Sequence, residues 1–117
     1  MELTMKLNSL PFEMIESGRK TIELRLYDEK RRKISVGDTI RFVLVDDESK
    51  ELKATVKELY IFSSFEELYK TLPLTECGYT ADTVKHASPK DMQEYYTSEQ
   101  EKKYGVLGIK IEVIADT

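Results

Sequence analysis

The sequence has one cysteine and one histidine among its 117 residues, and it has no long apolar run. A lone Cys77 cannot form an internal disulfide, which is typical of a reducing compartment and argues against a zinc site. The longest apolar runs, such as residues 42–45, are only four residues long, whereas a membrane span needs roughly 20. The first residues include Glu2 and Lys6 and show no signal-peptide core, so we expect a cytoplasmic protein without a membrane contact, a metal or another cofactor.

The charge of the chain is unevenly distributed. Its 18 basic and 22 acidic residues give a net charge of −4, which argues against a protein that coats nucleic acid indiscriminately. Residues 19–33 nevertheless hold seven bases and three acids, a local charge of +4 on a remainder of −8. Such a patch suits a local contact with a phosphate or a carboxylate. The simpler alternative is a solvated, charged turn.

One domain with a single core is the expectation for 117 residues of which 40% are hydrophobic. Period-2 alternation predicts strands, and apolar residues at helical spacing predict helices. The expected strands lie near residues 3–7, 21–26, 39–44, 52–61 and 109–113, and the expected helices lie near 9–17, 65–72, 89–96 and 97–104. A change of phase at Lys57 and Glu58 predicts a β-bulge, which bends a strand. The last strand is expected to turn Ile109, Ile111 and Val113 inward.

Residues 18–25, with the sequence GRKTIELR, place charged side chains beside a strand that has an apolar face. The alternation predicts a half-buried strand in which Glu23 and Arg25 share the polar face and point into one cleft. Gly18 is expected to end the preceding helix in a left-handed conformation. Lys20 then lies at the junction of helix and strand, from which its long side chain can reach the same cleft.

Three charged residues of this segment suit the recognition of a nucleotide. Arg25 offers a planar fork of donors for a phosphate or a base edge, and Lys20 offers a mobile cation. Glu23 can either accept a hydrogen bond from an exocyclic amine or hold Lys20 and Arg25 in place. The alternative is that these residues bind no ligand and that Glu23 and Arg25 form an exposed ion pair, which contributes little to stability.

The segment fits the pattern G-x-K-x-x-E-x-R, and the chain resembles the ASCH domain family, which has this signature. The resemblance extends to Pro11-Phe12 before the motif and to Tyr104-Gly105-Val106 at the last strand. It implies a single ASCH domain over residues 1–117, with a PUA-like fold of the α+β class. That fold is a mostly antiparallel β-barrel of about five or six strands with flanking helices, and the family is associated with RNA and modified nucleosides.

The leading hypothesis is therefore a module that binds RNA or a nucleotide or nucleoside, including a modified one. Lys20, Glu23 and Arg25 would form its ligand-binding cleft. Tyr95, Tyr96 and Tyr104 are candidates for stacking on an unpaired base, and Tyr96 and Tyr104 are preferred, although aromatic residues at helical spacing also pack on a core. The identity of the base, the oligomeric state and the presence of any catalysed reaction are left open by these residues.

The alternative function is a small hydrolase, either a ribonuclease or an amidohydrolase that acts on an acylated nucleoside. One ASCH branch hydrolyses acetylcytidine with a lysine, a threonine three residues later and a distant glutamate, and this chain has Glu23 in place of that threonine. If the protein is an enzyme, Lys20 and Glu23 are the candidate catalytic residues and would act on water. Thr21 is a candidate nucleophile, but it lies one residue after Lys20 instead of three, so its hydroxyl would reach a different position from that of the threonine in that branch. The distant glutamate has three candidates: Glu58, Glu66 and Glu67.

Overall fold

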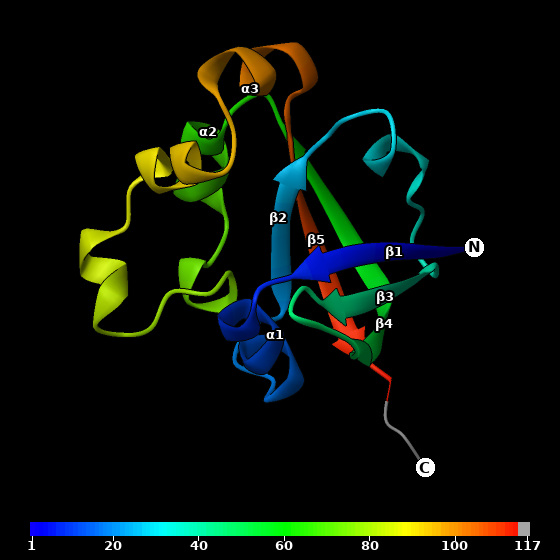
Figure 1. The fold of residues 1–117 in the computed structure, drawn as a ribbon. Helices are drawn as coiled ribbons and strands as arrows, with labels where there is room; N and C mark the ends of the chain where they lie inside the picture. Colours follow the sequence, from blue (N-terminus) through cyan, green and yellow to red (C-terminus); the bar gives the residue numbers. More distant parts are fainter. Residues whose placement is uncertain (115–117) are drawn as a thin grey trace.

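The computed structural model describes residues 1–114, which form a five-stranded sheet with helices gathered on one side (Figure 1). The strands are β1 (Glu2–Leu7), β2 (Ile22–Leu26), β3 (Thr39–Leu44), β4 (Asp47–Phe62) and β5 (Val106–Val113). The α-helices are α1 (Ser9–Glu16), α2 (Phe65–Thr71) and α3 (Ser98–Tyr104). Short 3₁₀ helices are η1 (Arg31–Lys33), η2 (Leu74–Glu76), η3 (Thr83–His86) and η4 (Pro89–Glu94). No helix within residues 1–114 is long and apolar enough to cross a membrane.

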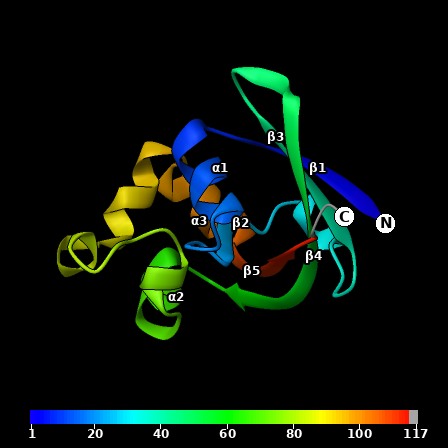
Figure 2. The same ribbon diagram turned by 90° about the horizontal axis from the view of Figure 1, so that it is seen from below.

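The sheet has the strand order β1-β3-β4-β5-β2. β1 runs parallel to β3, and all other neighbouring strands are antiparallel. The 16-residue β4 pairs first with β3 and then with β5, and it bends so that the sheet curls into a half-barrel (Figure 2). A register shift between Val56 and Glu58 confirms the expected β-bulge. The predicted α+β, PUA-like, mostly antiparallel barrel with flanking helices is thus confirmed, with five strands.

Two apolar clusters hold the strands and helices together. The first joins β1, α1, β3, β4 and β5, with Ile40 and Phe42 fully buried in it. The second joins β2 to α2, where Ile22 and Leu24 belong to the same cluster as Phe65. Because the apolar face of β2 packs toward α2, its charged face is left to turn toward β1, the strand at the other edge of the sheet.

Three expectations differ from the structure. β2 is buried on both faces rather than half-buried, because other parts of the chain cover its charged face as well. The expected helix over residues 89–96 is the 3₁₀ helix η4, which ends at Glu94 and begins with a capping box between Ser88 and Asp91. Val113 is 37% exposed rather than turned inward, because it is the last residue of β5 and lies outside both apolar clusters.

Candidate functional site

Lys20 lies between α1 and β2, at a junction that backbone hydrogen bonds hold in place. Gly18 follows α1 with a φ of 81°, the left-handed conformation that was predicted and that favours glycine. The amide of Lys20 donates to the carbonyl of Met14 at 3.0 Å, and the amide of Thr21 donates to the carbonyl of Glu76 at 2.9 Å. The backbone that leads into β2 is therefore held by hydrogen bonds at Lys20 and at Thr21.

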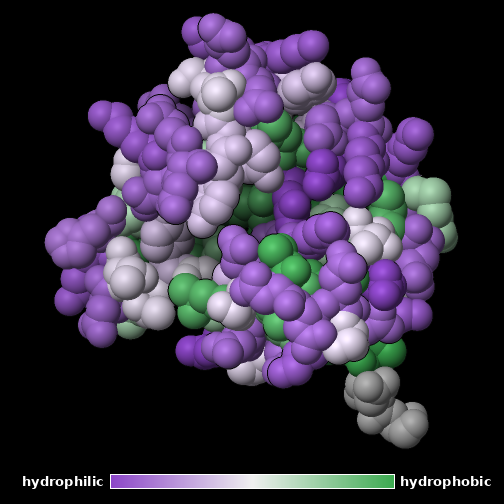
Figure 3. Space-filling view, viewed as in Figure 1, coloured by the Kyte–Doolittle hydropathy of each residue, from purple (hydrophilic) through white to green (hydrophobic). Residues whose placement is uncertain are grey.

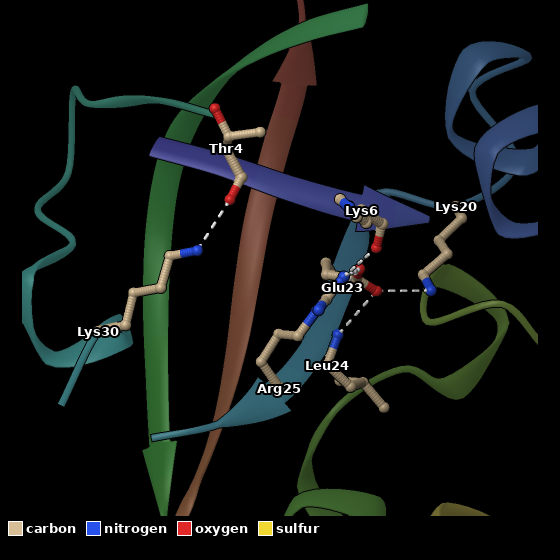
Figure 4. Close-up of polar contacts among 7 residues, drawn as sticks. All are labelled: Thr4, Lys6, Lys20, Glu23, Leu24, Arg25 and Lys30. Carbon is tan, nitrogen blue, oxygen red and sulfur yellow. Dashed lines mark hydrogen bonds and ion pairs between the residues drawn. The ribbon is translucent and has the colours of Figure 1, made fainter. Parts of the chain in front are cut away.

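Glu23 is a buried carboxylate with a cation on each side (Figure 4). The residue is 4% exposed. Its Oε1 pairs with Lys20 Nζ at 2.8 Å and accepts a hydrogen bond from the amide of Leu24 at 3.2 Å. Its Oε2 accepts from Arg25 Nε at 3.2 Å and from Arg25 Nη2 at 3.0 Å. These four contacts fill the lone-pair positions of a carboxylate, so the geometry favours the role in which Glu23 holds Lys20 and Arg25.

The charge of Glu23 is maintained by its partners. Burial by itself would raise the pKa of Glu23, but the charges of Lys20 and Arg25 and their hydrogen bonds outweigh burial and hold the pKa below its usual value. Glu23 is therefore ionised at neutral pH. One carboxylate between two cations leaves the cluster with a net positive charge, which suits a ligand that brings an anion or a hydrogen-bond acceptor.

Arg25 also connects the two edge strands of the sheet. Its Nη2 donates to the carbonyl of Lys6 in β1 at 3.1 Å, and Lys30 Nζ donates to the carbonyl of Thr4 in the same strand at 3.1 Å (Figure 4). Side chains thus join β1 to the chain around β2, and no backbone ladder within residues 1–114 does so. Two of the Lys20 Nζ protons make no hydrogen bond to the described residues and can contact a ligand, whereas the Arg25 guanidinium interacts with the Tyr96 hydroxyl as well as with Glu23.

A cavity of about 380 Å³ lies beside this cluster and is lined by Lys6, Lys20, Glu23 and Arg25. Figure 3 shows a hollow on this side of the molecule, with apolar surface inside and hydrophilic side chains around it. A second group of lining residues comes from α2, the loop after Cys77 and the region of η4. These residues are Tyr69, Tyr79, Asp91, Met92, Tyr95 and Tyr96. The cavity therefore combines a cationic group from β1 and β2 with an aromatic group from elements later in the chain.

A chain of hydrogen bonds orders part of the aromatic group. The Tyr79 hydroxyl donates to Asp91 Oδ2 at 2.7 Å and lies 2.7 Å from the Tyr69 hydroxyl, which therefore donates to Tyr79. Asp91 Oδ2 also accepts from the amide of Ser88 at 3.2 Å. Burial, together with the hydrogen bonds to Tyr69 and Asp91, raises the pKa of Tyr79 far above its usual range. The Tyr79 hydroxyl is thus neutral. The hydrogen bonds from Tyr69 through Tyr79 to Asp91 connect α2 to η4.

The structure brings Tyr96 to the cavity but leaves Tyr104 away from it. The Tyr96 ring stacks on Phe65 with centroids 6.0 Å apart and an angle of 15° between the planes. Burial raises the pKa of the Tyr96 hydroxyl, which therefore stays neutral. Tyr104, in contrast, packs against the cluster around β2, and its carbonyl accepts from Arg32 Nη2 at 3.0 Å. Tyr104 is not among the described residues that line the cavity; it is the last residue of α3, and Gly105 separates it from β5.

Thr21 also lies outside the cavity lining. Its Oγ1 donates to Glu76 Oε1 at 2.8 Å, across 55 positions of the sequence. The three glutamates considered as the distant catalytic residue line no part of the cavity within residues 1–114 and contact other groups. Glu58 pairs with Tyr60, Glu66 with Lys70, and Glu67 with the start of α2. Sequence reasoning missed Glu76 because the stretch from residue 73 to residue 88 has weak periodicity.

Sequence reasoning named Tyr95 and Tyr96 as candidates for stacking on a base, but it missed Tyr69 and Tyr79. Tyr69 fits the apolar face of α2, and Tyr79 lies in the stretch from residue 73 to residue 88, which has weak periodicity. Cys77 lines the cavity too, but burial raises the pKa of its thiol to about 12, as expected for an unreactive cysteine. Residues 1–114 contain no group of three or more His, Cys, Asp or Glu side chains placed to hold a metal ion.

Comparisons with known proteins place the chain among related structures. The ASCH domain model matches residues 5–115. Hypothetical protein PH0355 is 37% identical with a TM-score of 0.82, and the match covers 97% of this chain and 100% of that one. Protein PF0455 from Pyrococcus furiosus is 36% identical with a TM-score of 0.75, and the coverage is 99% and 100%. ASCH from Zymomonas mobilis, at 15% identity and a TM-score of 0.62 over 95% of this chain and 66% of that one, shares the fold. No curated protein matches the sequence.

Proposed function

Because the chain belongs to the ASCH domain family, whose members are generally proposed to bind RNA, we propose that it binds an unpaired nucleotide of an RNA in the cavity beside Glu23. The observation that carries this proposal is the pairing of two kinds of surface in one cavity. Lys20 and Arg25 supply cationic donors, and Tyr96 supplies an aromatic ring. A nucleotide is a ligand that needs both, since it has an anionic phosphate and a flat base.

The size and the charge of the cavity suit such a ligand. Its volume of about 380 Å³ lies at the lower end of the range of small-molecule sites, roughly 300–1,000 Å³. Lys20 Nζ has donors to spare, and Glu23 holds the side chains of both Lys20 and Arg25 in position before a ligand arrives. Pre-organised donors lose little conformational entropy on binding. In the proposed complex these donors contact the phosphate or a carbonyl oxygen of the base.

Tyr96 is the proposed stacking residue. Its ring is supported from one side by Phe65, so it presents a fixed surface to a base. Stacking of a base on an aromatic side chain contributes about 1–3 kcal/mol and is tolerant of sequence. The proposal therefore includes nucleosides with a modified base, provided that the modification leaves one face of the ring free.

The hydrolase alternative gains no support from the same geometry. Thr21 has its hydroxyl on Glu76 and is not among the described cavity-lining residues, so a covalent route through Thr21 lacks a positioned nucleophile. Glu23 has its four lone-pair positions occupied by Lys20, Arg25 and the amide of Leu24. A carboxylate in that state has no free acceptor with which to take a proton from water.

Binding to short unpaired RNAs tests the proposal. Fluorescence anisotropy with labelled RNAs of about six nucleotides, one for each base, would be measured for the wild type and for Lys20→Gln, Arg25→Gln and Tyr96→Leu. Each substitution is expected to weaken binding by about tenfold or more, because a charge-assisted hydrogen bond or a stacked base contributes about 1.5–3 kcal/mol.

The matched control is Lys70→Gln, which removes the same charge from an exposed lysine that pairs with Glu66 on α2. This variant is expected to bind within about twofold of the wild type. Thermal melting of every variant separates lost binding from lost folding. The proposal is wrong if no RNA binds the wild type, or if folded Lys20→Gln and Arg25→Gln bind as Lys70→Gln does.

A further inference from the structure

Two exposed apolar side chains stand on the lining of the same cavity. Leu10 of α1 is 63% exposed, and Tyr95, directly after η4, is 61% exposed. Each is among the most exposed large apolar residues of the described chain, and both line the cavity beside Glu23. Single exposed apolar residues are common on protein surfaces, but here two of them come from different elements and line the same cavity. This pair, Leu10 and Tyr95, is called the rim pair below.

The backbone of the rim pair is fixed although its side chains are exposed. The amide of Tyr95 donates to the carbonyl of Met92 at 3.1 Å, and the Tyr95 ring lies 6.4 Å from the Tyr96 ring at an angle of 56°. Leu10 is part of α1, whose buried side chains include Phe12 and Ile15. A tyrosine has only two side-chain torsions, so ordering it on binding costs little entropy. Tyr95 thus offers a contact surface next to the ring that stacks in the cavity.

A cationic residue on the same cavity lining indicates what covers the rim pair. Lys6 lines the cavity as well, and its side chain is 66% exposed. Its partner Glu48, 3.3 Å away, is 68% exposed, and an ion pair of this kind contributes little and yields readily to a stronger anion. An apolar and aromatic surface that shares one cavity lining with an exposed lysine suits a second nucleotide, with a base to stack and a phosphate to pair.

We propose that the rim pair and Lys6 form a second nucleotide subsite, in which the base next to the inserted nucleotide stacks on Tyr95 while the linking phosphate contacts Lys6. The inference rests on the proposed function, and it extends the recognised ligand from one unpaired nucleotide to two adjacent nucleotides of a strand. Tyr95 is then a specificity-determining residue for chain length, because only a polymer reaches from the cavity to the rim.

Calorimetric titration with mononucleotides and with the matching 5′-phosphorylated dinucleotides, in an adenosine and a uridine series, measures this subsite. The wild type is expected to bind the dinucleotide about tenfold tighter than the mononucleotide, since one stacked base contributes about 1–3 kcal/mol. Tyr95→Ala should lose this gain and still bind the mononucleotide as the wild type does. Tyr95→Phe should keep the gain, and Lys6→Gln should lose part of it.

Ile61→Ala is the matched control, because Ile61 is 54% exposed and lies on β4 away from the cavity lining. It is expected to keep the full gain. Equal wild-type affinities for the mononucleotide and the dinucleotide overturn the second subsite and leave the proposed function standing. Equal losses for both ligands in Tyr95→Ala overturn it too, because Tyr95 would then belong to the first subsite. Binding of neither series overturns the proposed function and the second subsite together.

Discussion

Replacement of Glu23 by glutamine tests whether this carboxylate is the counter-ion that positions the cations of the cavity. Glutamine has nearly the same size, but it brings no charge, and its amide nitrogen adds a donor where Lys20 and Arg25 need acceptors. The side chains of Lys20 and Arg25 are only 11% and 15% exposed, so water replaces the lost carboxylate poorly. Removing one partner from a buried ion pair costs about 3–5 kcal/mol. Because both cations keep some contact with water, we expect Glu23→Gln to lower the free energy of unfolding by about 3 kcal/mol.

The pH dependence of this loss has a definite sign. The folded state lowers the pKa of Glu23 below its unfolded value, which is about 4.3 for a glutamate. The stabilisation that the carboxylate contributes is therefore complete above about pH 4.3 and is lost as the pH falls through the folded pKa. The difference in stability between the wild type and Glu23→Gln should be largest at neutral pH and should shrink on acidification below about pH 4.

Urea unfolding followed by circular dichroism at about pH 7 and about pH 3.5 measures both effects. Glu66→Gln is the matched control, because Glu66 pairs with Lys70 at 3.3 Å but the two side chains are 71% and 74% exposed. An exposed pair of this kind contributes about 0.5 kcal/mol or less. If Glu23→Gln unfolds at the same urea concentration as Glu66→Gln at neutral pH, the reasoning about the buried counter-ion is refuted.

Two further predictions concern the cavity. The logarithm of the affinity for a short unpaired RNA should fall with the logarithm of the salt concentration with a slope of about −2, because Lys6, Lys20 and Arg25 line the cavity and neutralise roughly three phosphates at most. A slope steeper than about −5 in a salt titration would contradict this prediction and reveal a further basic surface. Cys77 should react slowly with a thiol reagent at about pH 8, because burial raises the pKa of the Cys77 thiol to about 12 and leaves little thiolate. Bound RNA should slow the labelling further because Cys77 lines the cavity, and labelling of the folded protein as fast as in urea would contradict this prediction.

The sequence by itself was enough to predict the local structure around the motif. Gly18 has the expected left-handed φ, and the shift between Val56 and Glu58 is the expected bulge. Each of these features depends on residues that are neighbours in the chain, so periodicity and capping preferences carry the information. The same local pattern placed Glu23 and Arg25 on one face of β2.

Only the tertiary structure decided what surrounds that face. An alternating pattern assigns side chains to the two sides of a strand, but it does not say what covers each side, and here both sides of β2 are buried. The sequence left two roles open for Glu23, a hydrogen-bond acceptor for a ligand and a counter-ion, and in the folded protein Lys20 and Arg25 occupy it as a counter-ion. The packing of α2 and η4 brings Tyr96, rather than Tyr104, to the cavity that Glu23 lines. The two groups of cavity-lining residues, at positions 6–25 and 69–96, are more than 40 positions apart in the sequence. Their geometry follows from the curl of the sheet and the packing of the helices, which no local preference specifies.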